Sequence, residues 1–180
     1  MTRIELQSRE TQPDHQHVWD MLERERQRPN SNIFRAIANL PDVLDRFIPM
    51  ANAIRDAGGL DAELRELVII MTCLTIGSSY EEDRHWNIAV RMGVSKDKLA
   101  AIWGFEHSSH FDEREKAVLR LARQTARAPA QVSEDVWRDV ERHLGSGPAL
   151  AVLFTVGWYK MTACVTGPLD LDDEPGFTRL

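Results

Sequence analysis

Apolar residues recur along this chain mainly with the spacing of a helix rather than that of a strand. Side chains three, four and seven positions apart share one face of a helix, and this spacing runs through nearly the whole sequence. It predicts helical segments at 14–29, 32–59, 61–77, 79–93, 96–103, 116–127, 134–145 and 148–165. We expect the second segment to consist of short helices, broken at Pro41 and Pro49 and closed by Gly58 and Gly59.

Short polar residues before several of these segments indicate where helices begin. Such a side chain can accept a hydrogen bond from a backbone N–H that has no partner within the helix. The predicted caps are Asp61, Ser95 and Ser133, with two capping boxes, Ser79 with Glu82 and Asp112 with Glu115. Gly77 is expected to end the helix that Asp61 begins.

Strand signals are confined to the β-branched runs LVII and VLFTV. Each run lies inside a longer segment, and that length favours a helix. The sequence therefore predicts one all-α domain over residues 1–180. Within it we expect an N-terminal helical extension at 1–30 and a mobile acidic tail at 170–180.

Composition narrows the class of protein. The chain has 180 residues, of which 43% are hydrophobic and 28% charged, and its net charge is −6. It has no strongly basic stripe to neutralise phosphates, so we expect no nucleic-acid partner. No secretory signal begins the chain, and the longest apolar run is about half of what a membrane span needs, so we expect a cytoplasmic protein with no membrane partner. Cys73 and Cys164 lie far apart in apolar surroundings, which predicts buried, reduced thiols.

Two acids and a histidine stand where the helical period calls for apolar residues. Glu81 shares a face with His85 and Ile88, and Glu66 lies on the apolar face of the preceding helix. A buried carboxylate without partners costs several kcal/mol. Because the two helices join tightly at 77–78, they can form a hairpin, in which Glu66 would have to reach His85 from roughly two and a half turns below the bend.

Each of these polar residues also has a structural interpretation. Ser79 and Glu82 can act only as caps, and Asp83 suits the positive end of the helix dipole. Glu81 can simply pair with His85 one turn later. The Glu/His set could hold a metal only with a third ligand, which the sequence does not supply, so no metal site is predicted. A second metal-like cluster falls in a predicted loop and is interpreted as polar surface: Glu106, His107 and His110.

Four stretches carry a resemblance when they are taken in order: LRELVII, GSSYEEDRHWNIAVRMGVSKDKLAAI, FDEREKAVLRLARQ and AVLFTVGWYKMTACV. In order, they contain a helix with the sequence LRE, a turn with the pattern Tyr-Glu-x-x-x-His, a helix end with the pattern A-x-x-x-G-V-S, and two helices with a G-x-Y pattern. From about Phe34 to Val165 the chain resembles the carboxymuconolactone decarboxylase family, which includes the alkylhydroperoxidase D proteins. The resemblance implies an all-α fold assembled as a homotrimer or homohexamer, with active sites lined by this helix pair. The wide apolar surface of helix 148–165 also points to a homo-oligomer.

The resemblance also separates two activities of that family. In its peroxidase branch a glutamate precedes a Cys-x-x-Cys-x-x-x-His motif. Glu66 matches that glutamate and His85 that histidine, whereas Ser78 and Glu81 stand where the two cysteines would be. Neither can form a thiolate or a disulfide, and Cys73 lies off the motif, so we expect no thiol peroxidase activity.

What remains is a carboxylate–imidazole site that looks like the lactone decarboxylase side of the family, with Glu66, Glu81 and His85 as the catalytic residues. Loss of CO₂ from an unsaturated lactone acid leaves a dienolate, whose oxygen His85 can stabilise and whose carbon an acid can protonate. Burial and like charge are expected to protonate one of the two glutamates.

Substrate contacts are expected from Ser78, Tyr80 and Arg84, with Arg84 or Arg91 binding a substrate carboxylate through its guanidinium. The sequence thus predicts a cofactor-free lyase or isomerase that acts on a small unsaturated lactone or another enolisable acid. The alternative is a non-catalytic oligomeric member of the family, in which the same cluster is structural. The two hypotheses differ in whether the cluster borders an open cavity or a filled core.

Overall fold

The computed structural model describes residues 1–26, 28–56, 59–174 and 179. Every regular element within these ranges is a helix, which confirms the predicted all-α fold. The α-helices are α1 (Gln16–Glu25), α2 (Asn32–Ile37), α3 (Pro41–Asp56), α4 (Ala62–Ile76), α5 (Ser79–Arg91), α6 (Lys96–Ala100), α7 (Glu113–Arg127), α8 (Glu134–Leu144) and α9 (Ser146–Thr166). Three short 3₁₀ helices join them, η1 (Pro13–His15), η2 (Ile102–His107) and η3 (Pro129–Gln131).

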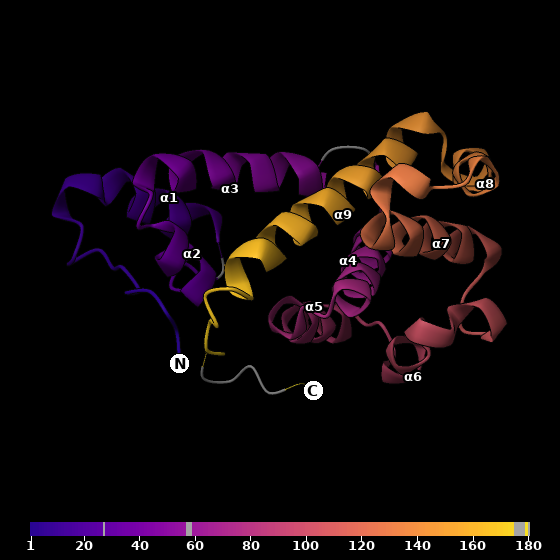
Figure 1. Cartoon of the computed structure of the whole chain (residues 1–180), viewed down its shortest axis with the longest axis horizontal. Helices are drawn as coiled ribbons and strands as arrows, with labels where there is room; N and C mark the ends of the chain where they lie inside the picture. The colour runs from indigo at the N-terminus through magenta and orange to yellow at the C-terminus, as the bar shows by residue number, and fades with distance from the viewer. Residues whose placement is uncertain (27, 57–58, 175–178, 180) are drawn as a thin grey trace.

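Helix α4 lies at the centre of the fold, where α9 crosses it diagonally (Figure 1). Apolar side chains point from it in every direction, so it must be covered all round. Helices α5, α7 and α9 supply that cover, and Leu67, Val68, Ile70 and Met71 have no exposed surface. The packing of α5 on α4 is the hairpin that the sequence predicts.

A second hydrophobic cluster joins the N-terminal helices to the rest of the molecule. Side chains of α1, α2 and α3, among them Leu22, Ile37 and Ile48, pack together with Tyr80 of α5 and with Leu171 beyond α9. The N-terminal extension is therefore built into the fold.

The described part of the acidic tail is tied down, contrary to the predicted mobility. The Thr2 hydroxyl donates to Asp172 Oδ2 over 2.9 Å, and the Arg3 N–H donates to the Leu169 carbonyl over 2.8 Å. Asn32 Nδ2 donates to the Asp172 carbonyl over 2.8 Å. The two ends of the chain thus hold each other, and part of the predicted tail, 175–178 and 180, lies outside the described residues.

Helix starts follow the sequence in part. Asp61 accepts a hydrogen bond from the Leu64 N–H over 2.8 Å, and Ser95 accepts one from Lys98. Asp112 and Glu115 form the complete capping box. Gly77 ends α4 in the left-handed conformation, with φ of +73°.

The capping prediction for α5 was wrong, and the one for α8 holds for the position of the cap but not for its hydrogen bond. Ser79 lies inside the first turn of α5, and Ser78 occupies the cap position without a side-chain bond. Glu82 instead forms an ion pair with Arg179 over 2.7 Å, so its side chain contacts the tail and does not complete the predicted capping box. Ser133 also sits at a cap position without a side-chain bond.

Pro49 does not break a helix. It lies within α3, where the buried neighbours Phe47, Ile48 and Ala51 hold the helix on both sides of it. Pro41 begins α3, the position where its fixed φ costs nothing. Of the two glycines expected to close this segment, Gly59 has a positive φ of 68°, and Gly58 lies outside the described residues.

The prediction for the cysteines holds for one of them. Both are free, but only Cys73 is buried, and Cys164 is exposed. Cys164 follows Leu150, Phe154 and Met161 at helical spacing on the outward face of α9. This outward face, although apolar, has no neighbouring helix to cover it within the described part of the chain.

Helix α9 is long and apolar enough to cross a membrane by length and composition, as no other helix in the described ranges is. In the fold 44% of its most apolar window is buried, and it packs against α4 and α7. A central helix of a folded helical domain passes the same test of length and composition.

Gly77 offers a test of the hairpin link. Gly77→Ala should lower the free energy of unfolding by about 1–2 kcal/mol, because an L-residue is strained in the left-handed conformation. An added Cβ at this position would meet no atom within 4 Å, so strain is the only cost. The control is Gly104→Ala, whose φ is −96° and whose Cβ also meets nothing. Urea denaturation of both variants checks this, and equal stability of the two would contradict it.

Candidate active site

The α4–α5 hairpin brings together the polar residues that interrupt its apolar faces. Glu66 lies in α4 and His85 in α5, on either side of the link at 77–78. Their side chains meet, with 2.5 Å between His85 Nδ1 and Glu66 Oε2. Glu66 therefore does contact His85 across the hairpin, a question that the sequence left open.

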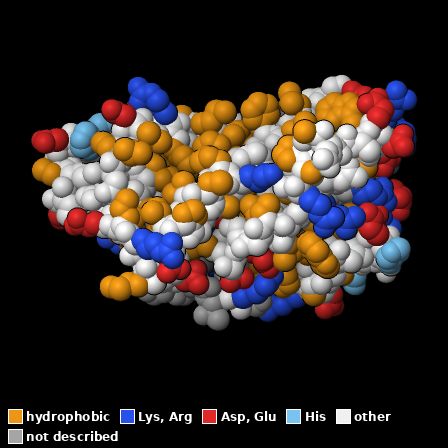
Figure 2. All heavy atoms as spheres, in the orientation of Figure 1, with side chains coloured by type: hydrophobic (Ala, Val, Ile, Leu, Met, Phe, Trp, Pro, Cys, Tyr) orange, Lys and Arg blue, Asp and Glu red, His pale blue; other side chains and the backbone are white. Residues whose placement is uncertain are grey.

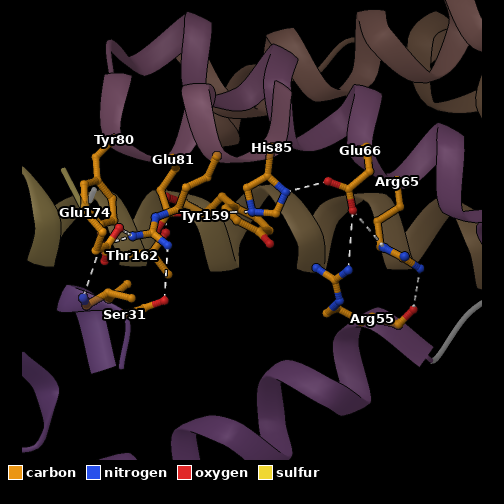
Figure 3. A network of polar contacts seen from close by, with 12 residues as sticks. Ser31, Arg55, Arg65, Glu66, Tyr80, Glu81, His85, Tyr159, Thr162 and Glu174 are labelled. Atoms are coloured by element: carbon orange, nitrogen blue, oxygen red, sulfur yellow. Dashed lines mark hydrogen bonds and ion pairs between the residues drawn. The ribbon is translucent and has the colours of Figure 1, made fainter. Parts of the chain in front are cut away.

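His85 stands between two carboxyl groups (Figure 3). Its Nδ1 faces Glu66, and its Nε2 lies 3.8 Å from Oε2 of Glu81, one turn earlier in α5. The ring of Tyr159, from α9, meets the imidazole edge-on, with 4.8 Å between the ring centroids. A neutral imidazole carries its proton on one of its two nitrogens. With that proton on Nδ1, in a hydrogen bond to Glu66, Nε2 is the unprotonated nitrogen and faces Glu81.

Glu66 has no exposed surface, yet it is surrounded by cationic partners. Arg55 Nη2 of α3 lies 3.5 Å from its Oε1, and Arg65 Nε lies 3.7 Å from the same atom. Burial alone would raise the pKa of Glu66, but the charges of His85 and of the two arginines outweigh it, and the pKa lies below its usual value. Glu66 is therefore the ionised carboxylate of the pair.

Glu81 is equally enclosed, at 5% exposure, but has weaker support for a charge. Burial raises the pKa of this carboxyl, and His85, Arg84 and a hydrogen bond with Thr162 oppose the rise only in part. The sequence predicted that one of the two glutamates would move toward the protonated form. The structure identifies Glu81 as that group.

A cavity of about 570 Å³ opens beside this cluster. His85 and Glu81 line it together with Tyr159 and Thr162 of α9. The N-terminal helices form the opposite wall, through apolar side chains such as Phe34. Six cationic side chains also border the cavity: Arg26, Arg28, Arg55, Arg65, Arg84 and Arg91. Glu25 borders it as well, so the cluster faces an open space with more cationic than acidic side chains in its wall rather than a filled core.

The three predicted substrate contacts are placed differently. Arg84 lines the cavity, and its Nη2 donates to the Tyr80 hydroxyl over 2.6 Å. Tyr80 supports Arg84 from behind and is not part of the cavity wall. Ser78 is absent from that wall too, because it occupies the link before α5. Arg91, the alternative to Arg84 as a carboxylate ligand, does line the cavity.

The geometry of the cluster does not suit metal chelation. Glu66 and Glu81 approach opposite nitrogens of the His85 ring, so the three cannot converge on one ion. Within the described residues no group of three or more His, Cys, Asp or Glu side chains could hold a metal. Glu106, of the second cluster, is bound instead by Arg120 and Arg123 over 2.9 and 2.8 Å.

Cys73 lies close to this site but has the character of a core residue. It packs with Ile69 and Tyr159 in a small apolar cluster. Burial raises the pKa of its thiol well above the usual value, and nearby carboxylates add to the rise. A neutral, buried thiol is a poor nucleophile.

Four residues of the site were missed by the sequence reasoning. They are Arg55, Arg65, Tyr159 and Thr162. Arg65 precedes Glu66 in the LRE motif, and Tyr159 is the tyrosine of the G-x-Y pattern, so both lay within motifs that were noted. Arg55 of α3 and Tyr159 of α9 both line the cavity, and no local pattern signals that these two helices meet there.

Residues 41–124 match the carboxymuconolactone decarboxylase family, and this segment carries α3, the α4–α5 hairpin and most of α7. The matched segment is just under half of the chain, and the fold of the whole chain is that of the alkylhydroperoxidase D-like proteins. No sequence among curated proteins matches the chain.

Solved structures with the same fold are distant in sequence. The debrominase Bmp8, as a cysteine-to-alanine variant in complex with 2,3,4-tribromopyrrole, is 19% identical with a TM-score of 0.83, over 98% of this chain and 94% of that one. An uncharacterised peroxidase-related protein with the alkylhydroperoxidase AhpD core, from Ralstonia eutropha JMP134, is 16% identical with a TM-score of 0.82, over 98% and 94% of the two chains. A peroxidase-related protein from Silicibacter sp. TM1040 is 17% identical with a TM-score of 0.78, over 98% and 93%. These likenesses establish the fold.

Two glutamine variants should change stability with opposite pH dependence. The folded-state pKa of Glu66 is lowered, so its stabilisation is present above pH 4.5 and is lost as the pH falls through the folded pKa. Glu66→Gln should therefore cost about 1–3 kcal/mol near neutral pH and little at low pH. The folded-state pKa of Glu81 is raised, so above pH 4.5 the folded state keeps a proton that the unfolded chain has lost, and stability falls as pH rises. Glu81→Gln removes that dependence and should gain on the wild type as pH rises.

Urea denaturation over a pH series measures both effects. Glu113→Gln is the control, because the Glu113 side chain is 72% exposed and should show neither trend. The assignment of charges fails if both variants lose stability in parallel, or if Glu81→Gln is the one destabilised at neutral pH.

Proposed function

We propose that this chain is a cofactor-free acid–base enzyme of the carboxymuconolactone decarboxylase type, which decarboxylates or isomerises a small unsaturated lactone or another enolisable acid. One observation carries the proposal. His85 is held by an ionised Glu66 and faces Glu81, a carboxyl with a raised pKa, in the wall of a cationic cavity. Paired groups whose environments push their pKa values apart are typical of acid–base sites.

The proposed chemistry assigns each group one task. When the bond to the leaving carboxylate breaks, its electron pair passes into the lactone carbonyl and CO₂ leaves. His85, with its Nδ1 proton bound by Glu66, donates from Nε2 to the dienolate oxygen when it is protonated there. Glu81 in its acid form returns a proton to the dienolate carbon and recovers one from solvent. In an isomerisation no CO₂ leaves; Glu81 in its carboxylate form takes the proton from carbon, His85 again stabilises the dienolate oxygen, and Glu81 returns that proton to another carbon.

The cationic lining supports an acidic substrate. Guanidinium groups bind carboxylates through two parallel hydrogen bonds, and Arg84 and Arg91 both border the cavity. Thiol chemistry has no support in this site, because Ser78 and Glu81 replace the cysteines of the peroxidase motif and the Cys73 thiol is held neutral. The two free cysteines suit a reducing cytoplasm, which is the location that we propose.

A non-catalytic role is the second candidate, and one observation favours it. Glu66 is fully paired by His85, Arg55 and Arg65, so the cluster satisfies its own charges without any ligand. In this second candidate the sole role of the network is to hold α3, α4 and α5 together.

A substrate assay separates the two candidates. Turnover of unsaturated lactone acids is followed by CO₂ release and by ultraviolet absorbance. We expect His85→Gln to lower kcat by about 10²- to 10⁴-fold, the range of a general acid–base group. The control is His110→Gln, an exposed histidine of the loop before α7, which should keep full activity. A wild-type protein that turns over none of these acids, or a His85→Gln variant with normal kcat, would contradict the proposed enzyme.

We also propose that the chain forms a homotrimer or homohexamer through the outward faces of α3 and α9. Five large apolar side chains on these helices are between 37% and 50% exposed: Val43, Met50, Leu150, Phe154 and Met161. We call them the α3–α9 patch, and Figure 2 shows hydrophobic side chains gathered over these two helices. A second copy is the partner that the family resemblance implies, and an apolar patch of this kind is typical of subunit contacts.

Light scattering tests the assembly. The wild type should give three or six times the chain mass of 20.6 kDa at micromolar concentration. Phe154→Glu should shift the protein toward the mass of one chain, because it places a charge in the patch. Trp103→Glu is the control, since Trp103 is 52% exposed but lies in η2, outside the patch. A wild type with the mass of one chain would remove the proposal.

A further inference from the structure

One carboxylate of the chain itself is already bound to Arg84, which lines the cavity. Glu174, from the segment after α9, accepts hydrogen bonds at Oε1 from the Asn32 N–H over 2.5 Å and from the Tyr80 hydroxyl over 3.0 Å. Its Oε2 accepts from Arg84 Nη2. The side chains of Arg84 and Glu174 are only 11% and 15% exposed. Three donors thus converge on one carboxylate, one from α2 and two from α5.

Arg84 links this group of donors to the cavity. Arg84 lines the cavity, and so does Ser31, whose hydroxyl lies 3.3 Å from Arg84 Nη1. Tyr80 fixes the guanidinium from below, with 4.3 Å between Arg84 Cζ and the centroid of its ring. In Figure 3 Glu174, Tyr80 and Ser31 lie on one side of His85, and Arg55 and Arg65 lie on the other.

The two sides differ in what neutralises their arginines. Arg55 and Arg65 are paired with Glu66, which is fully buried in a central helix and cannot leave. Arg84 is paired with Glu174, which lies three residues beyond the last buried anchor of the described tail, Leu171. The counter-ion of Arg84 is therefore the one that can be exchanged without opening the core.

We infer that Glu174 holds the place of a substrate carboxylate, and that an acidic substrate binds by exchanging its own carboxylate for that of Glu174 at Arg84, Tyr80 and the Asn32 N–H. The inference rests on the proposed function, because it names how the acid group of that substrate is recognised. A guanidinium as enclosed as that of Arg84 requires a partner in the empty and in the occupied state. Exchange of one carboxylate for another meets this requirement in both.

Exchange also gives selectivity for acids. A neutral lactone or amide cannot replace the charge of Glu174, so it leaves the tail in place. A carboxylate must compete with Glu174, and its apparent affinity is reduced by the fraction of molecules in which Glu174 is bound. Removal of the Glu174 charge should therefore strengthen the binding of acids and leave the binding of neutral analogues unchanged.

Calorimetric titration with 2-furoate, a small unsaturated ring acid without a lactone, measures this competition. We expect Glu174→Gln to lower the Kd of 2-furoate about 3- to 10-fold relative to the wild type, as the competitor is weakened. Asp173→Asn is the matched control, because it removes the same charge from the exposed neighbouring position and should change the Kd less than about twofold. The neutral 2-furamide should not distinguish the wild type from Glu174→Gln.

Hydrogen exchange on the wild type reads the displacement directly. Saturating 2-furoate should speed amide exchange in the peptide that spans residues 169–174, whereas 2-furamide should not. Three outcomes overturn the inference: equal affinity in Glu174→Gln and Asp173→Asn, no binding of 2-furoate to either the wild type or Glu174→Gln, or binding to the wild type with unchanged exchange in that peptide.

These measurements test the carboxylate exchange independently of the proposed function, since none of them depends on turnover. Displacement of Glu174 by 2-furoate in a protein without lactone turnover would sink the catalysis alone. Normal turnover, with an affinity for 2-furoate that is unchanged in Glu174→Gln, would sink the exchange alone.

Discussion

The contact between Glu66 and His85 is the constraint on which the rest of the site depends. A carboxylate without exposed surface in the central helix requires charged partners, because its desolvation is otherwise uncompensated. The fold supplies three such partners: His85 from α5, Arg65 from α4 itself and Arg55 from α3. The N-terminal helices, which bring Arg55, are therefore part of the site as well as of the fold.

This arrangement moves the pKa values of two similar carboxyl groups in opposite directions. Glu66 and Glu81 are both buried beside the same imidazole. Glu66 has two arginines and a bond of 2.5 Å to His85, which lower its pKa, whereas Glu81 lies 3.8 Å from the ring and burial raises its pKa. The fold thereby separates an anion that orients His85 from an acid that can give up a proton. Burial alone would have produced two acids, and exposure alone two anions.

The sequence could predict what depends on local spacing. Periodicity identified the all-α fold and placed Glu66, Glu81 and His85 on core-facing stripes, because a polar residue in such a stripe needs a partner. It could not predict contacts between segments distant in sequence. The Arg55 and Glu174 contacts depend on how α3 and the tail pack against α4, α5 and α9, and the same tail diverted Glu82 from the predicted cap. Pro49 was misjudged for a related reason, since tertiary packing kept α3 intact across it.

A carbon-13 NMR titration of the glutamate side-chain carboxyls tests the separation of charges most directly. The signals of Glu66 and Glu81 are assigned by their loss in the two glutamine variants. Glu81 should titrate above the ordinary value of 4.5, and Glu66 below it. Titration in the reverse order, or of both groups together near 4.5, would contradict the account of His85 held between an anion and an acid.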